Sequence, residues 1–180
     1  LIGELKVYFK ALKSFKYEPP VETKGIALPI YAGRTQEAEI LYDMKKFPHL
    51  LIAGVTGAGK SSIIRSILTT LIMERPKTRF ILGDLKRTEF HVFRGVQNCM
   101  VITKKDALLE VLRSVRDILD ARGDEMDAQG LTEWEGEDYI ICIDEVSRLK
   151  GEKEAKEIID EIGAVGRALG VYLILSTQRP

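Results

Sequence analysis

The chain has 180 residues and a formal net charge of zero, because 27 Lys and Arg balance 27 Asp and Glu. A hydrophobic fraction of 45% is enough for one ordinary core, which excludes a disordered or low-complexity chain. The balanced charge excludes a histone-like DNA binder with a basic excess. It conceals an internal polarity, since residues 51–100 carry eight basic and three acidic side chains and residues 101–170 carry ten and eighteen.

The sequence favours a cytosolic protein without a metal centre of its own. Cys99 and Cys142 lie in apolar runs without a paired spacing, which indicates reduced, buried thiols. No apolar stretch approaches the roughly 20 residues of a membrane helix, and the start lacks a signal-peptide pattern. Because the first residue is Leu, we expect a piece of a longer polypeptide. We expect it in the cytoplasm, at the cytoplasmic face of a membrane if the longer protein is anchored there.

The first 47 residues are expected to form an N-terminal segment that packs on, or leads into, the main unit at 48–180. Residues 1–16 alternate as a strand does, but they are equally consistent with a Lys-rich amphipathic helix. Two short strands are predicted at 25–31 and 38–42, separated by a turn around Gly33.

From Pro48 onward, strands and helices alternate along the chain. Thr103 and Asp106 are predicted to form a capping box at the start of the second helix, and the acidic stretch 123–138 to loop over the surface. This alternation predicts an α/β fold with a mostly parallel central sheet and helices on both faces. The predicted strands are 49–53, 79–83, 99–102, 139–143 and 171–176, and the predicted helices are 60–75, 104–123 and 152–169.

A phosphate-binding loop is predicted at residues 54–61, because GVTGAGKS matches G-x-x-x-x-G-K-[ST] between an apolar strand and a helix. Glycines let backbone N–H groups turn toward phosphate oxygens, and the helix start adds positive potential. Lys60 is expected to reach the β- and γ-phosphates and Ser61 to ligate Mg²⁺. An accidental glycine-rich turn is the alternative, which the strand and the helix disfavour. The expected nucleotide-binding residues are Gly54, Thr56, Gly57, Ala58, Gly59, Lys60, Ser61 and Ser62.

Paired carboxylates, Asp144 and Glu145, follow the apolar strand 139–143. An ordinary exposed strand end is the alternative, but the upstream loop gives the pair a chemical purpose. Asp144 is expected to hold Mg²⁺ together with Ser61, and Glu145 to orient and deprotonate the attacking water. The pair therefore predicts hydrolysis of a nucleoside triphosphate rather than transfer of its phosphate to a small molecule.

The tip of the last strand and the identity of the nucleotide are less sharply defined. Thr177 or Gln178 is expected to face the γ-phosphate or the water, unless the strand simply ends in a turn before Pro180. Residues 103–106 are similar to the guanine-reading motif of GTPases. However, no glycine follows Asp84 at the spacing that a GTPase switch requires, so we expect ATP.

Together these motifs resemble the FtsK/SpoIIIE family of DNA-pumping ATPases over about 48–180, with a weaker similarity from residue 26. The resemblance rests on PHLLIAG at 48–54 before the loop, on Asp84, Lys86 and Glu89 in the pattern D-x-K-x-x-E, on IDE at 143–145 and on STQRP at 176–180. The family continues beyond the last motif, so the C-terminal part of its domain is absent from this chain.

The resemblance implies a RecA-like P-loop motor that hydrolyses ATP with Mg²⁺ between the subunits of a hexameric ring around double-stranded DNA. Residue by residue, it implies that Gln178 is a phosphate sensor. It also implies that Arg167 reaches the γ-phosphate of the neighbouring subunit, although a solvated helix-end cation is equally plausible. The expected catalytic set is then Lys60, Glu145, Arg167 and Gln178.

The biological role is expected to be DNA translocation in conjugative transfer or in chromosome segregation. The wording around Asp84 and Glu145 is more similar to coupling ATPases of conjugative elements, whose transfer-machinery proteins would be partners. ATPases of type VII protein secretion share the domain and give the alternative, a motor that acts on protein. A basic cluster of Lys86, Arg87 and Arg94 is either a DNA contact or an ordinary solvated surface.

Overall fold

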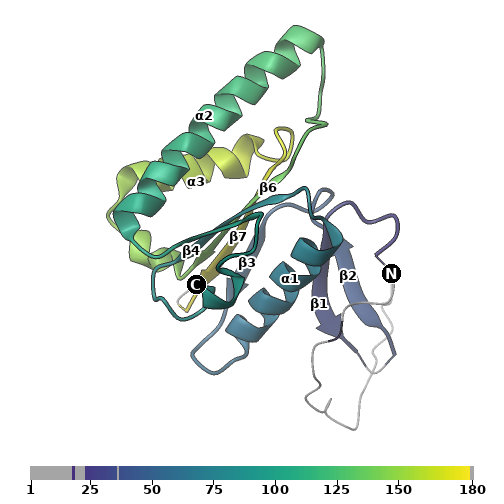
Figure 1. Cartoon of the computed structure of the whole chain (residues 1–180), viewed down its shortest axis with the longest axis vertical. Helices are drawn as coiled ribbons and strands as arrows, with labels where there is room; N and C mark the ends of the chain where they lie inside the picture. Colours follow the sequence, from purple (N-terminus) through teal and green to yellow (C-terminus); the bar gives the residue numbers. More distant parts are fainter. Residues whose placement is uncertain (1–17, 19–22, 36, 179–180) are drawn as a thin grey trace, which may run out of the picture.

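The computed structural model of the chain describes residue 18 and residues 23–35 and 37–178, so residues 1–16, Arg179 and Pro180 lie outside the described part. Short 3₁₀ turns lie at His91–Phe93 and Val146–Leu149. The strands are β1 (Pro29–Arg34), β2 (Glu39–Asp43), β3 (Leu50–Ala53), β4 (Arg79–Asp84), β5 (Cys99–Ile102), β6 (Tyr139–Asp144) and β7 (Val171–Thr177), and the helices are α1 (Lys60–Glu74), α2 (Lys105–Gln129) and α3 (Lys153–Val165) (Figure 1).

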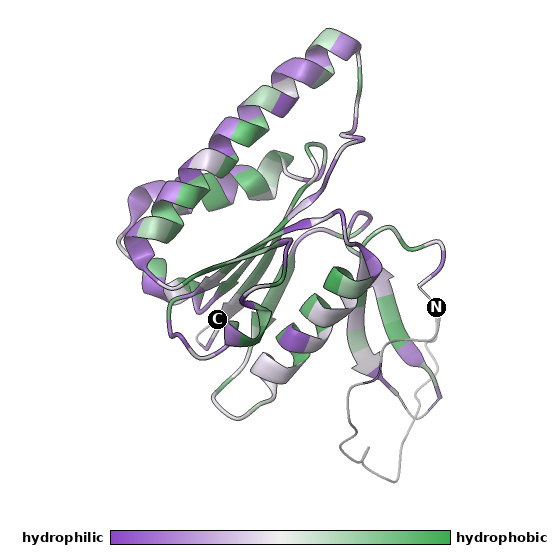
Figure 2. Cartoon of the chain, in the orientation of Figure 1, coloured by the Kyte–Doolittle hydropathy of each residue, from purple (hydrophilic) through white to green (hydrophobic). Residues whose placement is uncertain are grey.

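Five of these strands form one parallel sheet in the order β3-β7-β6-β4-β5. Helix α1 and the β1-β2 hairpin lie on one side of the sheet, and α2 and α3 lie on the other (Figure 1). The apolar side chains of the helices face the sheet (Figure 2). The predicted parallel α/β arrangement is therefore confirmed. Because β7 lies between β3 and β6, the phosphate-loop strand and the carboxylate strand are not neighbours.

The alternation of side chains along each strand divides the core into two layers. Ile140 and Cys142 of β6 pack on the α1 side, whereas Ile141 and Ile143 pack on the side of α2 and α3. A strand with period two then turns Asp144 toward the α1 side, where the phosphate loop begins its helix. The sheet therefore determines which of the two adjacent carboxylates faces the loop.

The hairpin belongs to the same core as α1. Leu28, Ile30 and Met44 are almost fully buried and pack in the α1 layer. The turn of the hairpin does not lie around Gly33 as predicted, because Gly33 is still part of β1 and pairs with Ile40. The chain reverses at 35–38, where the Thr35 hydroxyl accepts backbone N–H groups of residues 37 and 38. The division at 47/48 stays a prediction.

Two boundaries around α2 differ from the prediction. The helix begins after Lys104, and no side chain caps it, so the capping box does not form. The helix also continues to Gln129 because Arg122 and Met126 are buried on its inner stripe. Arg122 lies over the Trp134 ring at 4.5 Å and donates to the carbonyl oxygen of Leu169 at 2.6 Å. The acidic loop is therefore only 130–138, held at its base by this arginine.

Helix α3 also ends earlier than predicted, at Val165, and a series of turns at 166–170 leads into β7. Gly166 donates to the Ile162 carbonyl oxygen and accepts from the Val171 N–H, each at 2.8 Å. Elsewhere in the described residues, Cys142 is buried and Cys99 partly buried, both as free thiols. Within this part of the chain, none of the helices has the length and apolarity that crossing a membrane requires.

Replacing Gly166 is expected to destabilise the fold, because an added Cβ would overlap the carbonyl oxygens of Val171 and Ile162. We expect Gly166→Ala to lower the free energy of unfolding by about 1–3 kcal/mol, measured by urea denaturation. Gly163→Ala on the same segment is the control, since its Cβ would meet nothing within 4 Å. That control is expected to stabilise α3 by about 1 kcal/mol. Equal effects of the two substitutions would contradict the packing described.

Candidate nucleotide-binding site

The loop between β3 and α1 has the backbone of an anion-binding site. Gly57 and Gly59 both have φ of 85°, a left-handed conformation that glycine adopts without strain. Gly59 is the N-cap of α1, and no side chain caps the helix there. The first N–H groups of α1 are therefore available to phosphate oxygens, and the helix dipole favours that charge.

The loop opens into a cleft of about 420 Å³ at the carboxyl edge of the sheet. The structure brings together here residues from the phosphate loop and from the ends of β4, β6 and β7. The lining includes Thr56, Gly57, Gly59, Lys60, Ser61, Ser62, Lys86, Glu89, Asp144 and Gln178. Most of the predicted nucleotide-binding and metal-binding residues thus share one cleft.

Lys60, Asp144 and Ser176 form a buried cluster at the base of this cleft. Lys60 Nζ lies 3.0 Å from Asp144 Oδ1 and donates to Ser176 Oγ at 3.2 Å. The Ser176 hydroxyl donates to Asp144 Oδ1 at 2.6 Å and accepts the Glu145 N–H at 3.1 Å. A buried lysine and carboxylate need such pairing, because each alone would be a costly charge.

Ser176 is the residue that sequence reasoning missed, since Thr177 and Gln178 were the expected polar tip of β7. The side chains of Tyr172 and Ile174 pack in the α1 layer. Period two therefore turns Ser176 to the same side, and its exposed fraction is 0%. A fully buried hydroxyl that continues an apolar row was the signal that could have identified it.

Glu145 is held away from Asp144 by a left-handed backbone, with φ of 57°. Its carboxylate pairs with Lys86 Nζ at 2.7 Å and accepts the Ser147 hydroxyl at 2.5 Å. The Gln178 backbone N–H also donates to it, at 3.2 Å. Burial raises the pKa of Glu145, but the hydrogen bonds from Lys86, Ser147 and Gln178 outweigh burial and lower the pKa to about 2. Glu145 is thus a restrained carboxylate and a weak base.

The D-x-K-x-x-E residues have distinct structural roles. Asp84 accepts the backbone N–H groups of Thr88, Glu89 and Phe90 at 3.0–3.1 Å, and so it shapes the turn after β4. This turn places Lys86 against Glu145. Glu89 pairs with Arg65 of α1 at 3.0 Å on the wall of the cleft. Only Lys86 of the basic cluster at 86–94 therefore enters the site, while Arg87 and Arg94 are exposed.

Arg167 is not part of this cleft. It is exposed in the turns before β7, and its carbonyl oxygen accepts the Tyr172 hydroxyl at 3.5 Å. Parallel strands begin at the edge of the sheet opposite the phosphate loop, so Arg167 lies at the far edge from Lys60 within the chain. The trans role of Arg167 stays a prediction.

Removing Lys86 is expected to raise the pKa of Glu145. In Lys86→Met, burial would act without the ion pair, so the carboxylate should titrate well above its value of about 2. Carbon-13 NMR titration of the side-chain carboxyls measures this, with Glu145→Gln assigning the signal. Lys105→Met, which removes a remote pair with Glu152, should leave that titration unchanged. An unchanged Glu145 pKa in Lys86→Met would refute the restraint.

These features define a P-loop nucleotide-binding domain: a glycine loop between strand and helix, its lysine, and a carboxylate at the end of another parallel strand. Residues 18–147 match the FtsK/SpoIIIE family, to which the chain therefore belongs. The similarity announced by the sequence motifs and the RecA-like P-loop fold are thus confirmed. The proteins of this family are P-loop ATPases, and they include DNA translocases.

Relatives and solved structures agree with this assignment. The chain is 30% identical to the DNA translocase FtsK of Chlorobaculum tepidum, over 88% of this chain and 23% of that protein. It is 31% identical to the DNA translocase FtsK of Lactiplantibacillus plantarum, over 91% of this chain and 24% of that protein. It therefore spans about a quarter of the length of these relatives.

Two solved structures have the same fold. The pCW3 conjugation coupling protein TcpA, in its monomer form with ATPγS, is 26% identical with a TM-score of 0.78, covering 93% of this chain and 53% of that one. The cytoplasmic domain of the type VII secretion ATPase EccC from Thermomonospora curvata is 24% identical with a TM-score of 0.71, covering 85% and 21%. The second similarity concerns the fold alone.

Proposed function

We propose that the chain is the ATP-hydrolysing core of a motor that translocates double-stranded DNA in the cytoplasm. The observation that supports this most is the convergence of Lys60, Asp144 and Glu145 on one cleft beside the phosphate loop, in a chain of the FtsK/SpoIIIE family. The DNA substrate is proposed from relatives that are DNA translocases.

The donor set of the cleft fits Mg²⁺ bound with ATP. A serine hydroxyl and a carboxylate are oxygen ligands that Mg²⁺ accepts alongside phosphate oxygens, and Ser61 and Asp144 both line the cleft. Bound there, the ion would neutralise charge that develops on the phosphates. Lys60 would exchange its contact with Asp144 for one with the β- and γ-phosphates, which leaves the Asp144 carboxylate to the metal.

Glu145 is proposed as the base that deprotonates the attacking water, and its restraint by Lys86 sets the order of events. A carboxylate with a pKa of about 2 accepts a proton poorly. Lys86 lines the phosphate cleft, so an incoming γ-phosphate offers its ammonium a stronger partner than Glu145. Transfer of Lys86 to the phosphate would raise the pKa of Glu145 and release it to act. Gln178, at the same cleft, is proposed to contact the γ-phosphate.

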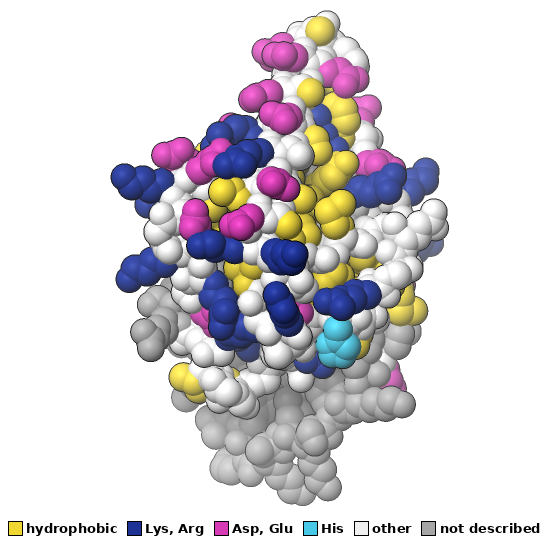
Figure 3. Space-filling view, turned by 60° about the vertical axis from the view of Figure 1, so that its left-hand side comes forward, with side chains coloured by type: hydrophobic (Ala, Val, Ile, Leu, Met, Phe, Trp, Pro, Cys, Tyr) yellow, Lys and Arg dark blue, Asp and Glu magenta, His cyan; other side chains and the backbone are white. Residues whose placement is uncertain are grey.

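The distribution of charge agrees with DNA contact near the carboxyl edge and not along the outer end of α2. Acidic side chains gather on the upper end of the molecule, where α2 projects, and Lys and Arg side chains lie lower on the same face (Figure 3). Duplex DNA is attracted by the second surface and repelled by the first. Conjugative transfer is favoured over chromosome segregation because TcpA, a conjugation coupling protein, has this fold at 26% identity.

The test is ATP hydrolysis by the full-length protein with and without duplex DNA. We expect DNA to stimulate hydrolysis several-fold, with Lys60→Ala weakening ATP binding on the order of 100-fold by removing a charged contact. Glu145→Gln should bind ATP normally but lower the rate on the order of 100-fold or more. Stimulation by a secreted peptide instead of DNA would support a motor for protein, and full activity of Glu145→Gln would refute its role as base.

A shared site between subunits of a ring, proposed from Arg167, has its own test. Arg167→Ala and Asp144→Ala should each be inactive, because one lacks the donated arginine and the other the metal ligand. Mixed together, they should recover part of the activity, since some interfaces then combine an intact cleft with an intact arginine. Light scattering or native mass spectrometry verifies mixed assembly. Absence of recovery in verified mixed assemblies would count against the shared site.

A further inference from the structure

A second hollow, of about 500 Å³, lies between the hairpin and α1. Strand β1 contributes Tyr31, Ala32 and Gly33 to its lining, and α1 contributes residues from its first three turns, among them Ser62 and Ser66. The size is within the range of small-molecule sites. None of the motifs that identify the phosphate site lies on the hairpin, so this hollow has no role in the chemistry described above.

The hollow is continuous with the phosphate cleft, because Gly59 and Ser62 line both. Gly59 closes the phosphate loop, and Ser62 stands in the first turn of α1. A ligand whose phosphates occupy the loop can therefore extend past Ser62 into the hollow without leaving the protein surface. The two spaces together form one elongated site with a charged half and a second half beside the hairpin.

The chemistry of the second half suits an uncharged, hydrogen-bonding group. Serine and threonine hydroxyls of α1 form one wall. On the opposite wall, Tyr31 pairs with Leu41 and Gly33 with Ile40, so that Ala32 is the extra residue of a bulge. The bulge leaves the Ala32 backbone without a partner residue on β2. Backbone groups of this kind read the edge of a planar base.

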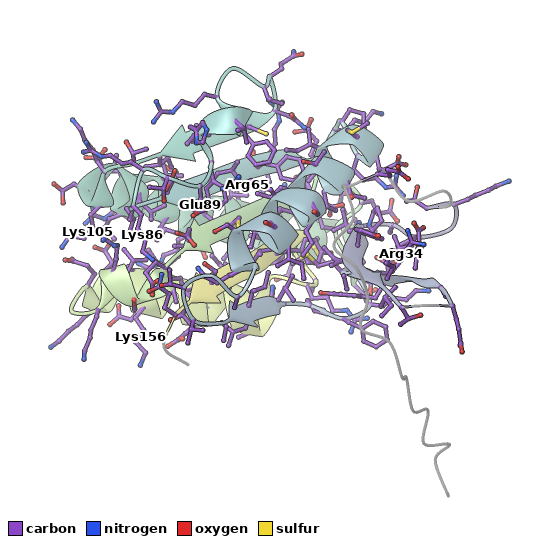
Figure 4. All side chains as sticks on the ribbon, turned by 90° about the horizontal axis from the view of Figure 1, so that it is seen from below. Arg34, Arg65, Lys86, Glu89, Lys105 and Lys156 are labelled. Carbon is purple, nitrogen blue, oxygen red and sulfur yellow. The ribbon has the colours of Figure 1, made fainter. Side chains whose placement is uncertain are left out.

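Arg65 provides an independent sign of a missing ligand. One end of its guanidinium pairs with Glu89 at 3.0 Å, and the two residues lie close together beside α1 (Figure 4). Its Nε is buried, yet it has no hydrogen-bond partner among the described residues. Arg65 lines the hollow. A buried donor without an acceptor is unfavourable, and an oxygen or ring nitrogen of a bound ligand would satisfy it.

From this geometry we infer that the hollow between the hairpin and α1 is a nucleoside pocket, which receives the base and ribose of the triphosphate held by the loop. The inference rests on the proposed binding of ATP at residues 54–61. It gives the β1-β2 hairpin a direct role in ligand recognition, with the Ala32 backbone facing the base and Arg65 Nε donating to the nucleoside.

The test fills the hollow and compares ligands with and without a nucleoside. Ser66→Phe places a ring in the hollow one turn beyond Ser62, away from the loop. By titration calorimetry with Mg²⁺, we expect Ser66→Phe to weaken ADP binding about tenfold or more and inorganic tripolyphosphate binding by less than about twofold. Met73→Phe, at an exposed position on the same helix outside the hollow, is the control and should change neither.

Each outcome of the titration separates the pocket from the phosphate site. Unchanged ADP binding by Ser66→Phe, or an equal loss for ADP and tripolyphosphate, would overturn the pocket. If the unaltered protein bound tripolyphosphate and ADP equally well, the phosphate site would stand and the pocket would fall. If it bound neither ligand, the proposed ATPase function would fail first, and the pocket with it.

A second measurement does not depend on a variant that folds. Photolysis of bound 2-azido-ATP, followed by peptide mass spectrometry, reports which residues surround the base. We expect labelling at residues 31–33 or 62–69, suppressed by excess ATP but not by excess tripolyphosphate at equal phosphate occupancy of a second, unlabelled site. Specific labelling elsewhere in the chain would place the base outside the hollow and overturn the inference.

Discussion

The buried pair of Lys60 and Asp144 is the interaction on which the rest of the site depends. Its partners come from the loop after β3 and the end of β6, and Ser176 of the intervening strand β7 joins them. Removing one member of such a pair leaves an uncompensated buried charge, at a cost of about 3–5 kcal/mol. Both charges must therefore change partners together. A polyphosphate that arrives with a divalent cation meets this requirement, because it supplies an anion for Lys60 and a cation for Asp144.

A second lysine-carboxylate pair lies beside the first and restrains the chemistry. Asp144 and Glu145 are adjacent in sequence, but the left-handed backbone at Glu145 directs them to different lysines. The site without nucleotide is thus nearly neutral, with each carboxylate paired. The first exchange admits the nucleotide, and the second, at Lys86, is proposed to activate the base only when a γ-phosphate is present. This division would limit futile chemistry on a diphosphate.

The sequence predicted the parts of the structure that local patterns determine. Strand β6 and its two carboxylates followed from an apolar run that ends in charge, and the phosphate loop followed from its spacing. The end of α2 was wrong because Arg122 interrupts the apolar stripe in the sequence, whereas in the fold Trp134 and backbone carbonyls satisfy it. Ser176 and the Lys86–Glu145 pair escaped prediction for a related reason. Contacts between strand ends depend on the order of strands in the sheet, which no local pattern specifies.

The position of Arg167 at the edge of the sheet opposite the cleft has a consequence for assembly. A single copy cannot bring its own arginine to its own phosphates, because the length of the sheet separates them. If that arginine serves a neighbour, the contact joins two different surfaces, and two copies related by a twofold axis cannot satisfy both clefts through one self-complementary patch. Such head-to-tail contacts propagate, and they end only when the rotation between copies closes a circle. The direction of the parallel sheet would then become the direction in which successive subunits fire around that circle.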